Sequence, residues 1–289
     1  MAKQSMQDIK RRIKSVSSTE RITNSMKLIS AGKLRRARKL YEETHENSLF
    51  ITNTIRELFQ TSDDIPTEYL DNSRKQDKTA YIVITSSKGL CGGFNTNVLK
   101  RAQEQIDSEK QSPHIVAIGG KGLEYFEKRG YDIYSSYLAA PETISFLETE
   151  ELSAPLIEMF DDGSINRVVL IYTAFVNAIE QKVVEKTLLP FHIEEDPDAA
   201  PAASQKTEYE PSAEVVFNYL IPKYVEMELF ASVIESATCE HAARRTAMEN
   251  ATDNAREMLN MLNLNYNRAR QAAITDQIIE IVAGAEAQR

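Results

Sequence analysis

Residues 248 to 273 read MENATDNAREMLNMLNLNYNRARQAA, and this stretch decides the fold of the chain. Its small and apolar residues follow one another at intervals of three or four: Met248, Ala251, Ala255, Met258, Leu262, Tyr266, Ala269 and Ala273. Such intervals keep one side of an α-helix against a second helix, with the left-handed supercoil of a coiled coil. The stretch therefore predicts a long helix that packs on a partner helix.

The predicted helix extends over residues 212–289. Pro222 can occupy a first helical turn, and beyond it no proline occurs and only Gly284 interrupts the pattern. Near the end of the chain, apolar residues come on nearly every side: Ile274, Ile278, Ile279, Ile281 and Val282. A helix that is apolar all round needs an apolar environment.

A second long helix is predicted over residues 1–65, which contain no proline and one glycine, Gly32. Its apolar stripe consists of Ile9, Ile13, Val16, Ile22, Met26 and Ile29, and continues through Leu34, Ala37, Leu40 and Tyr41 to Leu58. At about 1.5 Å per residue this helix is roughly 85 Å long. That length exceeds the diameter of a compact domain of this size, so the helix needs a partner helix and partner proteins. The two terminal helices together predict an antiparallel two-helix coiled coil.

The charge of the chain is divided unevenly. Residues 1–40 hold twelve Lys and Arg against Asp8 and Glu20, a net charge of +10, while the whole chain carries −9. A basic end on an acidic protein indicates a negatively charged partner. Composition leaves open a transit peptide, a nucleic-acid-binding arm, an amphipathic helix on a membrane surface, and a solvated coiled-coil face.

The middle of the chain, residues 78–193, has a different pattern. Strands rich in β-branched residues are expected at 79–85, 114–118, 167–175 and 181–189, with helices at 95–108 and 121–129 between them. This alternation predicts a Rossmann-like α/β domain with a mainly parallel sheet. Residues 194–211, rich in Asp, Glu, Ala and Pro, predict a flexible surface loop.

Two glycine-rich turns follow predicted strands. They read SSKGLCGGFN at 86–95 and GGKG at 119–122, and both open helices, as phosphate-binding loops do. Neither turn has the spacing of a P-loop or of the dinucleotide-binding fingerprint. A role in tight turns and close packing is therefore favoured over a nucleotide site.

The residues give no sign of catalytic, cofactor-binding or metal-binding chemistry. Cys91 and Cys239 lack CxxC spacing, which fits a reducing compartment, and the four histidines are scattered. No apolar run approaches the roughly 18 residues of a membrane-spanning helix, and no secretory signal is expected.

Three segments together carry a family signature. The first is IKRRIKSV at 9–16, continuing through TERITNSM at 19–26 to AGKLRRA at 31–37. The second is TSSKGLCGGFN at 85–95, and the third is YNRARQAAIT at 266–275 followed by EIVAGA at 280–285. In this order the chain resembles the gamma-subunit family of the rotary F-type ATP synthase, in its bacterial form.

The resemblance implies a non-catalytic rotor in the central stalk of a proton-translocating ATP synthase. One copy would pass into a ring of alternating alpha and beta subunits and rest on the epsilon subunit and the membrane c-ring. The complex would lie on the cytoplasmic face of the bacterial plasma membrane, with no cofactor and no nucleic acid bound by this chain. The residues that match the family's contacts to the ring are Met26, Arg244, Gln271, Thr275 and Glu280. Gln277 stands where the family usually has glutamate.

Two other classes of function remain open at this point. One is an α/β nucleotide-binding enzyme with a coiled-coil arm, which predicts ATP binding or turnover by the isolated chain. The other is a basic coiled-coil adaptor, which predicts salt-sensitive binding to DNA or to anionic vesicles.

Overall fold

The structure of the chain is a computed structural model that describes residues 6–61, 69, 78–108, 113–177, 180–191 and 209–286. The predicted loop at 194–211 lies outside the described residues except for its last three positions. The chain divides into two compact units. We call residues 1–31 with 244–289 the helical unit, and residues 32–243 the α/β unit. The division into an N-terminal helix, an α/β domain, a loop and a C-terminal helix stays a prediction.

Two long helices contribute to both units. Helix α1 comprises Met6–Thr61 (56 residues) and helix α5 comprises Ala213–Glu286 (74 residues). Pro222 lies inside α5 and not in its first turn, so its ring leaves one backbone carbonyl of the preceding turn without an N–H donor. Among the described helices, none has an apolar stretch long enough to cross a membrane.

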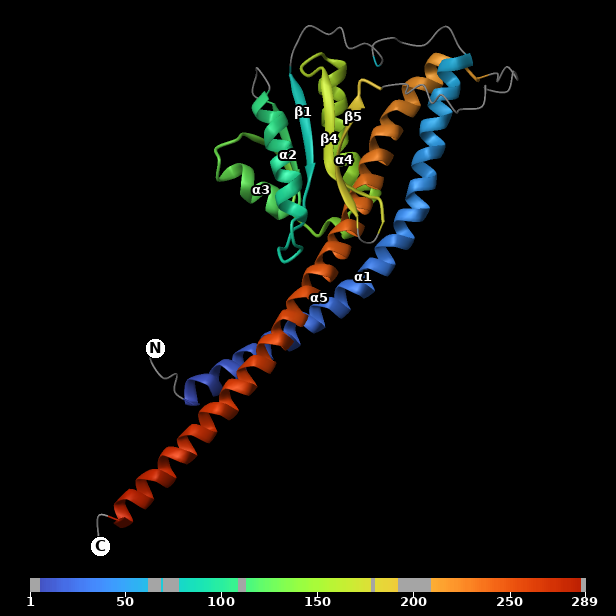
Figure 1. Cartoon of the computed structure of the whole chain (residues 1–289). Helices are drawn as coiled ribbons and strands as arrows, with labels where there is room; N and C mark the ends of the chain where they lie inside the picture. Colours follow the sequence, from blue (N-terminus) through green and yellow to red (C-terminus); the bar gives the residue numbers. More distant parts are fainter. Residues whose placement is uncertain are drawn as a thin grey trace. The chain divides into compact units, whose positions relative to one another are not determined.

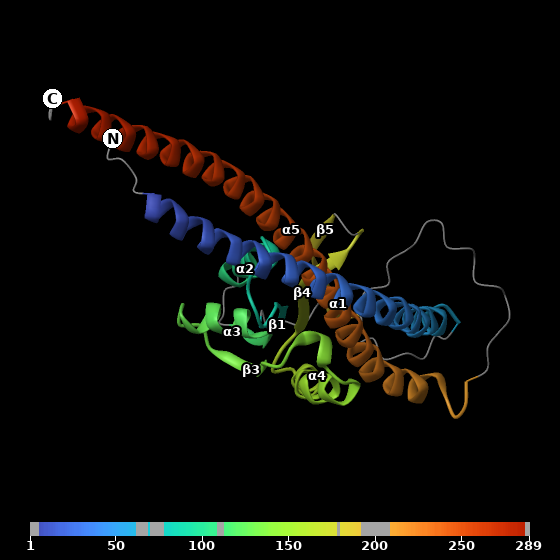
Figure 2. The ribbon, with the colours of Figure 1, turned by 90° about the horizontal axis from the view of Figure 1, so that it is seen from below.

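In the helical unit, α1 and α5 run antiparallel, and Figures 1 and 2 both show them side by side. Three side-chain contacts fix their register: Glu20 with Arg256, Thr23 with Thr252, and Lys27 with Glu249. As the residue number rises on one helix it falls on the other. The predicted pairing of the terminal helices is confirmed.

The residues at the seam between these helices differ in part from the prediction. On α5 one series of less exposed positions runs through Met248, Thr252, Ala255, Leu259, Leu262, Tyr266 and Ala269, and Ala247, Glu249 and Ala251 beside it are also half-buried. On α1 the matching series of less exposed positions is Ile9, Ile13, Val16, Glu20, Thr23, Lys27 and Ser30. The steps of three and four alternate strictly on both helices, as a heptad repeat requires.

Ala273, predicted for the seam, instead belongs to the exposed segment from 270 to 285. Three more of the predicted seam residues lie beside the observed seam. Ile22 is 57% exposed, Ile29 62% and Met258 48%. Each lies one residue before a true seam position, and one residue turns an α-helix by about 100°. At Thr23 and Ser30 the heptad continues through polar residues, which an apolar pattern does not indicate. Next to Met258 it continues through the equally apolar Leu259.

In the α/β unit, five strands form one sheet in the order β3-β2-β1-β4-β5. Their bounds are Thr79–Ile84 (β1), His114–Ile118 (β2), Ile133–Tyr137 (β3), Arg167–Phe175 (β4) and Gln181–Leu189 (β5). Strands β1 to β4 are parallel, and β5 pairs antiparallel with β4. The mainly parallel sheet is confirmed.

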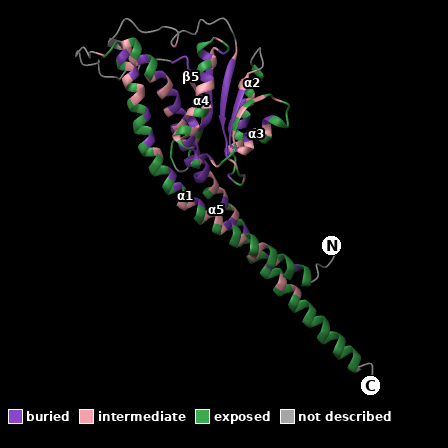
Figure 3. Ribbon diagram, turned by 180° about the vertical axis from the view of Figure 1, so that it is seen from behind, coloured by how far each residue is buried: buried purple, intermediate pink, exposed green. Residues whose placement is uncertain are grey.

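The two faces of the sheet are covered by different helices, and strands β1, β2 and β4 are buried at most positions (Figure 3). Tyr81 and Val83 of β1 pack with Val98 and Leu99 of α2 (Phe94–Ser108), beside α3 (Gly120–Glu127). The alternate β1 residues belong to a core shared with α4 (Phe146–Asp161) and with the parts of α1 and α5 in this unit. This alternation follows from the two-residue period of a strand, and it makes the two terminal helices part of the α/β core.

Two described elements escaped the sequence pattern. Strand β3 is an edge strand whose residues alternate between half-buried and exposed, so it lacks an apolar run. Helix α4 contains Pro155, which argues against a helix in sequence. A signal for α4 was present, because Ser145 and Glu148 form a capping box at its start. A short 3₁₀ helix, Pro141–Thr143, precedes it.

Candidate functional site

The inner seam of the helical unit is rich in polar contacts. The Thr252 hydroxyl donates to the Thr23 hydroxyl at 2.9 Å, and both residues are buried. Arg256 Nε lies 3.1 Å from Glu20 Oε1. The buried Thr23–Thr252 pair adds little net stability but favours one register over others. The Glu20–Arg256 pair lies at the rim of the seam, where the Arg256 side chain is 51% exposed. This part of the helix pair is therefore fixed in alignment more than it is strengthened by apolar burial.

The outer surface of α1 in the same unit combines apolar and basic side chains. Ile22, Leu28 and Ile29 are all more than half exposed. Arg21 is exposed beside Ile22, and further exposed cations lie nearer the start of the same helix: Lys10, Arg11, Arg12 and Lys14. Apolar side chains that a helix leaves outside its own seam indicate contact with another molecule.

The C-terminal part of α5 has no packing partner within the described chain. Every residue from 270 to 285 is exposed, although the segment remains helical. Its exposed apolar residues are Ile274, Ile278, Ile279, Ile281 and Val282. A single helix of this length is marginally stable in water, so this end of α5 needs a surrounding surface from another protein.

The five residues predicted to contact the ring all belong to the helical unit. Met26 and Arg244 are half-buried, and Gln271, Thr275 and Glu280 are exposed on α5. Among them, Gln271 and Thr275 lie one turn apart, and the Thr275 hydroxyl donates to the Gln271 backbone carbonyl oxygen at 2.9 Å. The polar seam was missed by sequence reasoning, although the heptad steps from Ile9 and Met248 lead to it.

The glycine-rich turns of the α/β unit are occupied by internal contacts. Gly119 has a φ of +93°, and a Cβ there would lie 2.1 Å from the Thr85 carbonyl oxygen. The amide of Ser86 donates to Asn95 Oδ1, and the amide of Gly122 donates to the Thr85 hydroxyl. Amide groups that would hold a phosphate are thus already hydrogen-bonded. Gly119 and Gly122 thus serve close packing, whereas a Cβ at Gly89 would meet nothing within 4 Å.

Comparison with known proteins identifies the family. A family model described as ATP synthase matches residues 5–288. The ATP synthase gamma chain of Alkaliphilus metalliredigens is 43% identical over 285 residues, covering 98% of each chain. That of Desulforamulus reducens is 41% identical over 283 residues, covering 98% of this chain and 99% of the relative.

The chain belongs to the ATP synthase gamma-chain family. The resemblance noted in the three sequence segments is thereby confirmed over the full length compared. Another relative, from Acetobacterium woodii, is 40% identical over 300 residues and is described as a sodium-ion-specific gamma chain. Because this family includes a gamma chain described as sodium-ion-specific, the coupling ion can be a proton or a sodium ion.

Solved structures show the same fold at lower identity. A chain of the Euglena gracilis mitochondrial ATP synthase aligns with a TM-score of 0.68 and 20% identity, over 98% of this chain and 94% of that one. A chain of the Tetrahymena thermophila mitochondrial ATP synthase central stalk and c-ring aligns with a TM-score of 0.61 and 22% identity, over 80% of this chain and 99% of that one. These solved chains thus share the fold of two long helices and an α/β sheet.

Proposed function

We propose that this chain is the rotating central-stalk subunit of a bacterial F-type ATP synthase. Family membership gives the class of complex, and one structural observation carries the mechanism. The helix from 270 to 285 is exposed on all sides and apolar at five positions, so its surroundings must come from other subunits. A ring of alpha and beta subunits around this helix supplies an apolar sleeve in which an apolar end can turn.

The outer surface suits contacts that form and break. Exposed ion pairs contribute about 0–1 kcal/mol each, so the exposed cations of α1 can attract acidic surfaces without holding them permanently. A rotor that meets three successive neighbours in each turn needs such weak contacts. The paired helices of the helical unit provide the stiffness through which torque passes to the beta subunits, where ATP is made or hydrolysed.

We assign the ring contacts to the residues that match the family pattern, namely Met26, Arg244, Gln271, Thr275 and Glu280. Met26 lies on α1 and the others lie on α5, all within the helical unit. The α/β unit would rest on the epsilon subunit and the membrane ring, which places the chain at the periphery of the membrane. The driving ion is a proton or a sodium ion.

Reconstitution with the alpha and beta subunits tests this function. Deleting residues 270–289 should weaken assembly or the hydrolysis of ATP that depends on this subunit, because the apolar end loses its sleeve. Deleting only 287–289 is the matched control and should leave both unchanged. An assembled complex that is indifferent to the longer deletion would remove the assignment of this helix end.

A further inference from the structure

A cavity of about 320 Å³ lies in the α/β unit among three elements. Helix α1 contributes Lys33, Arg36, Ala37 and Leu40; the 3₁₀ turn contributes Glu142 and Thr143; α5 contributes Ile234, Ala237 and His241. Its volume is at the small end of the range for small-molecule sites, about 300–1,000 Å³. None of these residues belongs to the outer faces assigned to the ring.

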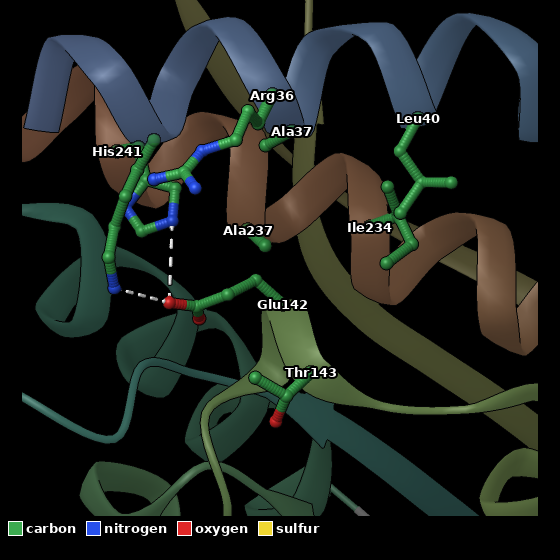
Figure 4. Close-up of a pocket in the computed structure, with 9 residues that line it drawn as sticks. Arg36, Ala37, Leu40, Glu142, Thr143, Ile234, Ala237 and His241 are labelled. Carbon is green, nitrogen blue, oxygen red and sulfur yellow. Dashed lines mark hydrogen bonds and ion pairs between the residues drawn. The ribbon is translucent and has the colours of Figure 1, made fainter.

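The cavity is polar at one end and apolar at the other (Figure 4). Arg36 and His241 lie on one side, and Leu40 and Ile234 lie on the opposite side, with Ala37 and Ala237 between them. The two alanines leave the middle open, because larger side chains at these positions would fill it. This layout matches a ligand with one polar end and one apolar end.

The charges at the polar end leave a cation available. Glu142 Oε1 lies 2.8 Å from Lys33 Nζ and 3.6 Å from Nε2 of the buried His241. Burial raises the pKa of the Glu142 carboxyl, but the hydrogen bond from Lys33 and the nearby His241 outweigh burial and hold this pKa below its usual value. Glu142 is thus an ionised partner that Lys33 already neutralises.

Arg36 has no ion-pair partner within the part of the chain that the structure describes. Its guanidinium group lines the cavity beside this neutralised pair. Lys33 and Arg36 together carry one more charge than the Glu142 carboxylate balances, so these three side chains leave one net positive charge at the polar end. A planar guanidinium group binds a carboxylate through two parallel hydrogen bonds.

We infer that this cavity is a binding site for a small amphipathic carboxylate. The carboxylate pairs with Arg36, and the apolar body of the ligand packs on Ala37, Leu40, Ile234 and Ala237. The bound molecule joins α1, the 3₁₀ turn and α5. Because a ligand that binds only the folded state stabilises that state, occupancy raises the stability of the α/β unit.

The test measures binding to the purified full-length chain by calorimetry, with three probes. The amphipathic acid 4-phenylbutanoate should bind, whereas its neutral analogue 4-phenylbutanol and the bare head group acetate should each bind at least about tenfold more weakly. Rising salt should weaken the binding of the acid, because Arg36 is exposed. Equal binding of the acid and the alcohol would overturn the role of Arg36.

Two substitutions test the two ends of the site separately. Arg36→Gln should reduce the affinity for 4-phenylbutanoate about tenfold, whereas Arg35→Gln, at an exposed neighbour that does not line the cavity, should leave it unchanged. Leu40→Ala should lower the affinity for 4-phenylbutanoate and the affinity for 4-phenylbutanol by a similar factor. An unchanged affinity in Arg36→Gln, or binding that vanishes once the chain is assembled with alpha and beta subunits, would contradict the proposal.

Discussion

The hydroxyl of Thr252 on α5 donates a hydrogen bond to the hydroxyl of Thr23 on α1 at 2.9 Å, inside the seam of the helical unit. Both residues are buried, and Thr23 also donates to a backbone carbonyl oxygen of its own helix. The pair joins residues 229 positions apart in sequence. It marks a seam whose alignment depends on polar contacts.

Replacing Thr252 by Val should cost the helical unit about 1 kcal/mol, because a hydrogen bond between the two helices is lost. The Thr23→Val/Thr252→Val double variant should cost less than the sum of the single variants, because two apolar side chains then face each other. Native-state hydrogen exchange of residues 244–269 measures the opening free energy of this unit. Thr275→Val, at an exposed position, is the control. Additive effects in the double variant would show that the hydroxyls do not interact.

A matched pair on α5 tests the observed heptad. Leu262 is 9% exposed and belongs to the seam, whereas Met258 is 48% exposed and does not. Leu262→Ala should lower the opening free energy of the helical unit by about 2 kcal/mol, and Met258→Ala by no more than about 0.5 kcal/mol. The same exchange measurement compares them. A larger loss in Met258→Ala would support the apolar stripe predicted from sequence instead.

The carboxylate of Glu228 in α5 is only 6% exposed and lies 2.6 Å from Lys186 Nζ of β5, which is 41% exposed. Lys186→Met should destabilise the α/β unit by about 2–3 kcal/mol, because it leaves a buried carboxylate without its cation. Adding Glu228→Gln should restore part of that loss. Urea unfolding followed by far-ultraviolet circular dichroism gives both values. A Lys186→Met variant as stable as the wild type would indicate that Ser48, also hydrogen-bonded to Glu228, suffices to compensate the charge.

Glu235 of α5 makes the stability of the α/β unit depend on pH. Burial raises the pKa of its carboxyl above the ordinary value of 4.5, although the Phe175 amide, Tyr172, His45 and Lys186 act in the opposite direction. The folded state therefore holds this proton more strongly than the unfolded chain does. Stability from this group is present below pH 4.5 and is lost as the pH rises through the raised pKa.

Glu235→Gln removes that titration while keeping an oxygen that can accept from the Phe175 amide. The stability of this variant relative to the wild type should rise between pH 4.5 and pH 7, as measured by urea unfolding at several pH values. A stability difference that does not change with pH would contradict the raised pKa. Glu124→Gln is the control, because the pKa of Glu124 is shifted in the opposite direction from that of Glu235. The hydrogen bonds from Lys121 and Lys128 lower the pKa of Glu124 to about 2.

Much of the fold could be predicted because its signals are local. The β-branched runs that became β1, β2 and β4 are buried at most positions, and the run that became β5 is buried at its end. The terminal helices lack interior proline except Pro222. The seam was predicted only in part. Glu20, Thr23 and Thr252 belong to it but are polar, so a search for apolar residues does not find them. Strand β3 was missed because its apolar signal is weak. Helix α4 was missed because Pro155 lies inside it.

The candidate sites were less accessible to sequence reasoning. The cavity is assembled from Lys33, Glu142 and His241, which come from three distant parts of the chain. The contacts assigned to Met26 and Glu280 depend on surfaces of other subunits, so only a family pattern could suggest them. Residues 270 to 285 are exposed in the chain by itself, as expected for a segment that other subunits cover.

The central claim is that the paired terminal helices turn inside a ring of other subunits. The most direct measurement attaches a visible label to the α/β unit and immobilises the beta subunits of a reconstituted complex. Addition of ATP should then produce rotation of the label in one direction, in three steps per turn, and the rotation should stop when ATP is removed. Steady ATP hydrolysis with a stationary label would contradict the account.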